Sequence, residues 1–188
     1  MSPSSKPFSA VLLVAGAILA AAAAPAPQNK PEALAQNFYD LTMRYNATGA
    51  IPGTPQQTRL DRMLTPTLMA KVDQARRADK TYTRKYGVTR RPLIEGDLFS
   101  SLYDGPTAMD FASCRADTAT TLRCPVLLSN GEGSGAVRWT DTLVLVKLIP
   151  GWRIDDIEFG GAGPDSRTGT LTGLLRQVVD TAYHKKEN

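Results

Sequence analysis

The stretch from Asp141 to Phe159, DTLVLVKLIPGWRIDDIEF, constrains the fold of this chain more than any other part of the sequence. It is dense in Leu, Val and Ile, and no other stretch has as much unbroken β-propensity. Pro150-Gly151 interrupts it, so the pattern predicts two long strands joined by a turn. We therefore expect an antiparallel sheet on which the rest of the chain packs as helices.

The second of these strands changes the side of its apolar residues partway along. By strict alternation Trp152 and Ile154 share one face, whereas Ile157 and Phe159 share the other. The change falls at Asp155-Asp156 and predicts a β-bulge or bend there. A strongly curved sheet needs such a device.

Two further strands are predicted before this stretch, at 110–115 and 123–129, as a hairpin with a polar tip. The sequence NGEGSG at 130–135 then carries the Asn-Gly signal of a second turn. Strands at 137–149 and 152–159 follow it. The sequence thus predicts an antiparallel meander of four strands.

Helical patterns occupy the first half of the chain and its end. Apolar spacing predicts a helix from Pro31 to about 47–49, and Thr54-Pro55 and Thr65-Pro66 predict the starts of two more. A last helix is predicted at 170–184. This segregation predicts an α+β fold, in which amino-terminal helices pack on a curved, cone-like four-stranded antiparallel sheet and a C-terminal helix closes it.

The first residues are typical of an export signal. Lys6 is positive, and Phe8–Ala23 is apolar and ends in small residues. A membrane anchor is the alternative, but the run is short for a span and no basic flank follows it. No cysteine ends the run, so we expect a periplasmic or secreted protein without a lipid anchor. The predicted boundaries are a signal peptide at 1–24, a linker at 25–30, one domain at 31–184 and a tail at 185–188.

Charge and cysteine content narrow the class further. Removal of the signal lowers the 22 basic residues to 21 against 18 acidic ones, and a net charge of +3 is too small to indicate nucleic-acid binding. Cys114 and Cys124 form an even pair, which favours a disulfide in an exported chain over two buried thiols. Closing so short a loop stabilises by about 3 kcal/mol in the chain-entropy model. The one histidine, His184, lies near the end, so we predict no metal site and no cofactor.

The segment from Arg76 to Arg91 is strongly basic and has two interleaved tyrosines. One interpretation is a docking face for an anionic protein partner, a lipid headgroup or a polyanion, with peripheral membrane contact as its weakest form. The other is a solvated helix face, which is common. The residues that would carry a docking role are Arg76, Arg77, Lys80 and Arg84.

Several short segments resemble an uncharacterised family of exported bacterial envelope proteins near the nuclear-transport-factor-two-like superfamily. They are Phe38-Tyr39, the Pro92…Gly96-Asp97…Phe99 segment, Cys114 and the run from Gly151 to Ile157. The resemblance covers about residues 31–178 and implies a cone fold and an envelope location. Many members of that family look like lipoproteins, whereas this chain lacks the lipidation cysteine.

Enzymes on cone folds similar to ketosteroid isomerase use an acidic or histidine base in the concavity of the sheet. The candidates here are Asp97 and Asp156, with Asp155 beside the latter. Burial of Asp97 would raise its pKa, but a helix N-cap is an alternative role. Neighbours on a regular strand point to opposite faces, so Asp155 and Asp156 can equally face solvent or pair with an arginine.

Aromatic residues supply the remaining candidates for a binding site. They either line an apolar pocket in the concavity or belong to the core beneath the helices. The four residues are Phe99, Tyr103, Trp139 and Trp152.

Three functions follow from these patterns. The first is a non-enzymatic envelope protein that binds a partner protein or a small apolar ligand through the face of its sheet. The second is a small-pocket enzyme with Asp97 or Asp156 as general base, and the third is an immunity or inhibitor protein. No Gly-x-Ser-x-Gly nucleophile elbow is present, and the Gly-rich run at 160–163 lacks the Gly-Lys-Ser/Thr ending of a phosphate loop.

Overall fold

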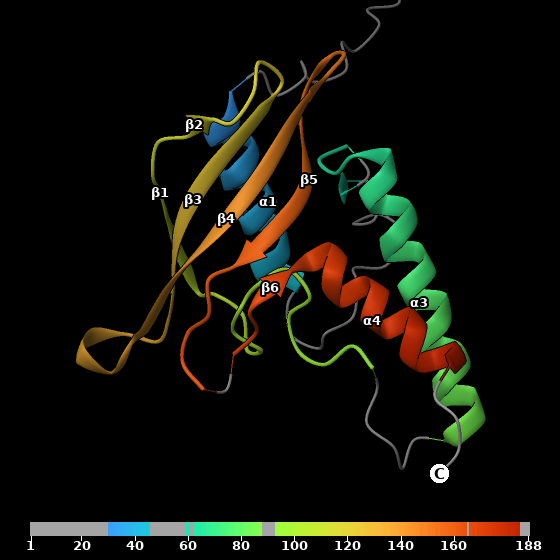
Figure 1. The fold of residues 1–188 in the computed structure, drawn as a ribbon. Coiled ribbons are helices and arrows are strands. Elements are labelled where there is room, and N and C mark those ends of the chain that lie inside the picture. Colours follow the sequence, from blue (N-terminus) through green and yellow to red (C-terminus); the bar gives the residue numbers. More distant parts are fainter. Residues whose placement is uncertain (1–29, 46–58, 61, 88–92, 165, 185–188) are drawn as a thin grey trace, which may run out of the picture.

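A computed structural model describes residues 30–45, 59–60, 62–87, 93–164 and 166–184 of the 188-residue chain. Within these ranges the chain forms three long helices and six strands (Figure 1). The helices are α1 (Pro31–Tyr45), α3 (Pro66–Tyr86) and α4 (Leu171–His184). The strands are β1 (Ala108–Phe111), β2 (Arg115–Ala116), β3 (Thr121–Asn130), β4 (Val137–Leu148), β5 (Gly151–Phe159) and β6 (Gly169–Thr170).

The six strands form one antiparallel sheet in the order β1-β3-β4-β5-β6, and β2 also pairs with β3. The predicted α+β class with an antiparallel sheet is confirmed. The predicted number of four strands was too low, because β2 and β6 have two residues each and leave no periodic pattern in the sequence. The first predicted strand, 110–115, is divided between β1 and β2.

Strand β5 contains the bulge that the sequence predicts. Val144 of β4 pairs with Asp156, but the next residue, Leu145, pairs with Ile154, so Asp155 is the extra residue. Ile154 and Ile157 are consequently both fully buried on the core side of the sheet. The bulge therefore corrects the change of apolar parity that the sequence displays.

Helix α1 covers one face of the sheet. Figure 1 shows it behind β3, β4 and β5, with no helix of the described part in front of β3 and β4. Phe38 and Tyr39 of α1 are fully buried, as are Leu143 and Leu145 of β4, whereas Thr140 on the opposite face of β4 is exposed. One face of the sheet is thus core and the other is open.

Helices α3 and α4 lie side by side beyond the β5 edge of the sheet (Figure 1). The segment that leads into α3 covers this edge, because the Ile154 N–H donates to the Met63 carbonyl and the Thr65 N–H donates to the Ile154 carbonyl, both at 2.8 Å. Strand β6 pairs with the end of β5. The backbone of β5 therefore has partners on its outer side.

The predicted helices at Pro31, at Thr65-Pro66 and at 170–184 correspond to α1, α3 and α4. Thr65 caps α3 as predicted, since its Oγ1 accepts the Leu68 N–H at 3.1 Å. The signal peptide, the tail and most of the linker and of the predicted short helix lie outside the described residues. No helix in the described ranges is both long enough and apolar enough to cross a bilayer.

The predicted disulfide between Cys114 and Cys124 is present. It joins the residue before β2 to the middle of β3, next to the pairing of Arg115 with Arg123. Cys124 is fully buried. A disulfide fits an oxidising compartment outside the cytoplasm.

Candidate functional site

The loop between α3 and β1 carries Asp97, the first of the predicted acidic residues. Gly96 before it has φ +64°, and a Cβ atom there would lie 2.2 Å from the Tyr103 carbonyl oxygen. The Asp97 N–H donates to that carbonyl at 2.7 Å, and Asp97 Oδ1 accepts the Phe99 N–H at 2.8 Å. Gly96 thus allows the loop to close on itself, and Asp97 is turned into the protein.

The second buried acid is Asp141, on the core face of β4. Its two carboxylate oxygens accept bonds from the Ser101 N–H at 2.9 Å, the Ser101 hydroxyl, the Trp139 indole N–H at 3.1 Å and the Gly160 N–H at 3.0 Å. Asp141 is fully buried. It joins the sheet to the loop of Asp97 on one side and to the loop after β5 on the other.

Arg167 is the third member of this site and comes from the loop before β6. Its guanidinium donates to the carbonyl oxygens of Glu95, Asp97 and Ser100, and lies 4.4 Å from the centre of the Tyr103 ring. Burial lowers the pKa of this guanidinium, and the neighbouring Tyr103 and Asp97 oppose the change. Arg167 therefore clamps the loop of Asp97 by its backbone.

Two buried polar groups in this interior have no hydrogen-bond partner among the described residues. They are Asp97 Oδ2 and the hydroxyl of Tyr39. Burial raises the pKa of Asp97 to about 6, although the Phe99 N–H and Arg167 lower it. Burial also raises the pKa of Tyr39, and the charges of Asp141 and Asp97 add to this effect. An unpaired buried carboxyl oxygen is rare and is a mark of functional sites.

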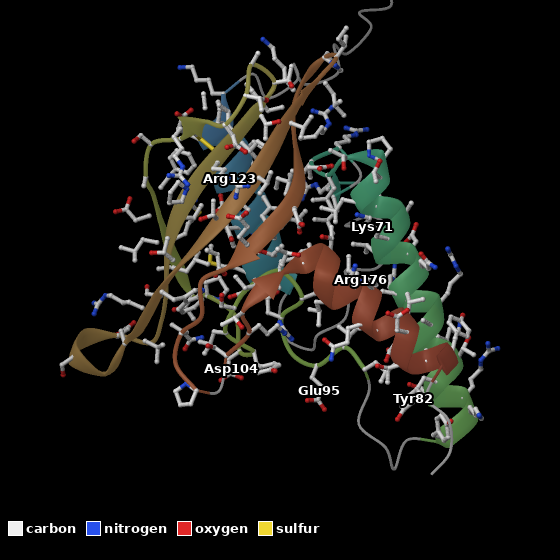
Figure 2. All side chains as sticks on the ribbon, in the orientation of Figure 1. Lys71, Tyr82, Glu95, Asp104, Arg123 and Arg176 are labelled. Atoms are coloured by element: carbon white, nitrogen blue, oxygen red, sulfur yellow. A yellow bond between two sulfur atoms is a disulfide. The ribbon has the colours of Figure 1, made fainter. Side chains whose placement is uncertain are left out.

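A cleft of about 550 Å³ opens beside Arg167, between α4 and the loop of Asp97. Glu95 extends from this loop below α4 in Figure 2. The apolar part of the wall comes from Leu93, Ile94, Phe159, Leu174 and Val178, and the polar part includes Glu95, Arg167, Thr170 and Gln177. Arg167 lines this cleft and also holds the backbone of Asp97, whose carboxyl is not part of the cleft wall.

The four predicted aromatic residues do not gather in one place. Tyr103 lines the cleft and is 42% exposed, whereas Phe99 and Trp139 are buried in the core. Phe99 stacks edge-on against Phe38, with 5.3 Å between ring centres. Trp152 is half-buried at the start of β5. Phe99 and Trp139 therefore belong to the core, and Tyr103 lines a cleft beside α4 rather than the predicted pocket in the concavity of the sheet.

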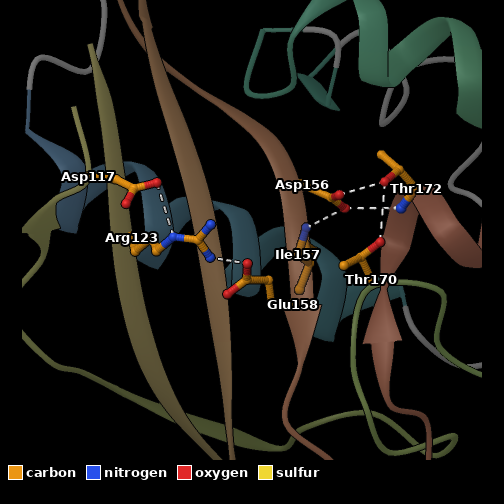
Figure 3. Close-up of polar contacts among 7 residues, drawn as sticks. All are labelled: Asp117, Arg123, Asp156, Ile157, Glu158, Thr170 and Thr172. Carbon is orange, nitrogen blue, oxygen red and sulfur yellow. Dashed lines mark hydrogen bonds and ion pairs between the residues drawn. The ribbon is translucent and has the colours of Figure 1, made fainter. Parts of the chain in front are cut away.

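Asp155 and Asp156 each hold the start of a helix. Asp155 accepts the Thr65 hydroxyl at 2.7 Å, and Thr65 caps α3. Asp156 accepts the Thr172 N–H at 3.0 Å and the Thr172 hydroxyl at 2.5 Å at the start of α4 (Figure 3). Both oxygens of Asp156 therefore accept hydrogen bonds at the start of α4. This geometry indicates that Asp156 holds the start of the helix. It does not match the two alternatives to a general base that the sequence suggested, a solvent-facing residue or a partner of an arginine.

Figure 3 also shows a chain of charges on the open face of the sheet. Arg123 on β3 pairs with Glu158 on β5 and, at 3.2 Å, with Asp117. The pair with Glu158 crosses the intervening strand β4, and the pair with Asp117 joins β3 to the turn after β2. They are surface ion pairs, which contribute little to stability individually.

The predicted basic face lies on the C-terminal part of α3. Figure 2 labels Lys71 and Tyr82 on this helix. Arg77 and Lys80 are exposed there. Arg76 is half-buried and pairs with Asp73 at 3.9 Å, and Arg84 is exposed. The geometry is compatible with either a docking face or a solvated face.

The sequence did not single out Asp141, Arg167 or Tyr39 as site residues. A weak signal exists for Asp141, because it occupies a core-facing position in an alternating strand. Arg167 lies in a segment predicted as a flexible loop, but its N–H donates to the Ser101 carbonyl at 2.8 Å and anchors the loop. Within the described ranges no three His, Cys, Asp or Glu side chains are grouped as a metal site would require.

A search with protein-family models found no match for this chain, and searches of curated proteins and of solved structures found none either. The likeness to the envelope family therefore stays a prediction. What the site can do is argued from its own geometry.

Proposed function

We propose that this is an exported, non-enzymatic envelope protein that binds a small, largely apolar ligand in the cleft beside α4. The observation that supports this most is the cleft itself, with about 550 Å³ of space and a wall that combines apolar side chains with polar ones. Ligand sites in proteins have volumes of roughly 300–1,000 Å³ and combine an apolar lining with a few fixed polar groups. This cleft has both features.

The chemistry of the wall favours a neutral ligand with a polar end. Arg167 already donates to three carbonyl oxygens, and Glu95 brings a negative charge to the same wall. The two charges offset each other, so an anionic ligand gains little there. Thr170 and Gln177 offer uncharged hydrogen-bonding groups to a hydroxyl or carbonyl.

The rest of the proposal concerns place and shape. The disulfide and the predicted signal peptide support export. The bulge in β5 and the helix on one face support the cone-like curvature that the resemblance implies. An envelope location supplies apolar molecules from the membrane as ligands.

A neutral apolar fluorophore, N-phenyl-1-naphthylamine, tests the cleft. We expect saturable binding that weakens by about tenfold in Leu174→Gln, because this side chain lines the cleft. Leu127→Gln is the control, since Leu127 is an equally apolar residue that is 43% exposed on the open sheet face. Equal affinity in both variants would overturn the proposed site, provided that both melt as the wild type does.

One observation favours a second candidate, the small-pocket enzyme with Asp97 as base. Asp97 has a pKa of about 6 and an oxygen without a partner in the described structure, as an acid–base group would need. However, Asp97 is 3% exposed, and its carboxyl is not part of the cleft wall. A reacting molecule would reach it only if the loop of Asp97 opened.

The two candidates differ in whether the ligand affects Asp97. Carbon-13 NMR can follow the titration of the Asp97 carboxyl with and without saturating fluorophore. A binding protein should show the same pKa in both cases, because the buried carboxyl is not part of the cleft wall. A change of about one unit or more would favour the enzyme.

A further inference from the structure

The turn between β4 and β5 presents apolar side chains to water. We call residues 148–150 the hairpin tip. Ile149 is 101% exposed and Leu148 38%, and Pro150 is also exposed. Single exposed apolar residues are common on proteins, but three in succession at the end of a long hairpin form a protruding apolar point.

The residues around the hairpin tip have the chemistry of a membrane interface. Trp152 is half-buried, and Lys147 places its ammonium 6.0 Å from the centre of the Trp152 ring. The Lys147 N–H donates to the Thr120 carbonyl at 2.8 Å, which sets the β2–β3 turn beside the tip. Tryptophan and lysine at the edge of an apolar region are typical of groups that lie at the level of lipid headgroups.

Further cations lie toward the same end of the molecule. Figure 1 shows the start of α1, the β2–β3 turn and the turn after β4 at this end. Lys30, before α1, and Arg115, at the start of β2, are exposed. The acids nearby are Glu32, which is exposed, and Asp117, which pairs with Arg123. Exposed cations beside an apolar point match the negative surface of a membrane that contains anionic lipids.

The position of the predicted export signal in the sequence also favours a membrane at this end of the domain. The described part begins at Lys30, and the apolar stretch Phe8–Ala23, predicted as the export signal, precedes it in sequence. A signal that has not yet been cut lies in the membrane. The end of the domain that contains Lys30 and the hairpin tip is then the end nearest the bilayer.

We propose that the hairpin tip inserts into the boundary between headgroups and acyl chains of a phospholipid membrane that carries anionic lipids. Ile149 and Leu148 enter the apolar phase, Trp152 lies at the boundary, and Lys147 and Arg115 face the phosphates. The proposal rests on the proposed export, but it is independent of the cleft, which lies toward the other end of β5.

The shape of the tip favours a membrane over a protein partner. A stable protein interface buries on the order of 1,000 Å² or more and needs a broad complementary surface. The hairpin tip is a narrow convex point, and the exposed apolar side chains at its end are Leu148, Ile149 and Pro150. A bilayer adapts its shape to such a point, whereas a folded partner would need a dedicated pocket.

Vesicle flotation tests this with the protein purified after export. We expect binding to vesicles of phosphatidylethanolamine and phosphatidylglycerol, and quenching of Trp152 by brominated acyl chains, since Trp139 is buried and gives a constant background. Ile149→Ser should weaken binding by about tenfold or more. Lys147→Gln should weaken it several-fold on anionic vesicles and leave neutral vesicles unaffected.

Leu127→Ser is the matched control, because it removes an exposed leucine from the open sheet face without touching the tip. Equal losses in Leu127→Ser and Ile149→Ser would overturn the proposal, and so would wild-type binding by Ile149→Ser. The proposal would also be overturned if the protein did not bind vesicles and a photoreactive residue at position 149 cross-linked to another protein. The occupant of the hairpin tip would then be a partner protein. Ile149→Ser should bind the naphthylamine normally, so failure here is distinct from failure of the cleft.

Discussion

Asp97 and Asp141 lie in the same buried interior, yet their surroundings differ in one respect that decides their roles. Asp141 accepts four hydrogen bonds, two of them from Ser101. Asp97 accepts one through Oδ1, and its Oδ2 has no partner in the described structure. Two carboxylates of similar burial thus differ in how completely their acceptors are used.

The difference arises from where each residue lies in the chain. Asp141 occupies a strand, so the pleat fixes its direction and two loops bring their N–H groups to it. Asp97 belongs to one of those loops and is held by contacts to its backbone, chiefly from Arg167. Asp141 therefore has a structural role, because its carboxylate holds two loops to the sheet. Asp97 is buried by the contacts of its backbone, so one of its carboxyl oxygens has no partner in the described structure.

The largest effect should follow from Asp141→Ala. Four donors would lose their acceptor in a dry interior, so we expect the free energy of unfolding to fall by about 4 kcal/mol. Urea denaturation measures this. Asp110→Ala, at an exposed position of β1, is the control and should change stability by less than about 0.5 kcal/mol. A loss below about 1 kcal/mol would mean that Asp141 does not hold the loops.

Asp97→Asn should raise the free energy of unfolding relative to the wild type as pH rises, whereas Asp141→Ala should lower it. The folded pKa of Asp97, about 6, exceeds the ordinary 3.8, so the folded state holds its proton longer than the unfolded state. Wild-type stability should therefore fall relative to Asp97→Asn as pH rises from about 4 to about 6, by up to about 3 kcal/mol. The amide oxygen of Asn still accepts the Phe99 N–H.

Urea denaturation at several pH values gives this difference, and subtraction of the variant removes the titration of all other groups. A wild type that gains stability over the variant across the same window would contradict the raised pKa. In that case Oδ2 would have a partner that stabilises its charge.

Arg167→Lys tests whether the loop of Asp97 is held by Arg167, because it removes the guanidinium hydrogen bonds and keeps the positive charge. A lysine ammonium cannot span the three carbonyl oxygens that the planar guanidinium reaches, so we expect a loss of about 2 kcal/mol. Hydrogen exchange should rise at the amides of residues 95–103 and not in α1. Unchanged exchange in that loop would show that Arg167 is not its clamp.

Tyr39→Phe should have the smallest effect. The Tyr39 hydroxyl is buried without a partner in the described structure, so its removal takes away no hydrogen bond. We expect a change within about 1 kcal/mol, of either sign, in thermal or urea unfolding. A larger loss would show that the hydroxyl is satisfied in solution, and that Asp97 and Tyr39 belong to a connected polar network like that of Asp141.

Local sequence patterns predicted some of these site residues and not others. Gly96-Asp97 attracted attention because glycine before a carboxylate beside apolar residues is a recognisable local pattern. Arg167 did not, because its partner Glu95 is 72 residues away and its own surroundings, rich in Gly and Ser, are typical of a loop. The contact of Ser101 with Asp141 spans 40 residues and is equally invisible to periodicity.

The sequence by itself determined the elements whose causes are local. Alternating apolar residues specify β4 and β5, the parity change specifies the bulge at Asp155, and Thr65-Pro66 specifies the start of α3. Tertiary structure alone decided which carboxyl oxygen is left without a partner among the described residues, and that the apolar side chains of the hairpin tip are exposed. Both depend on which distant segments reach a given point in space, and hydrogen bonding and burial follow that proximity rather than spacing along the chain.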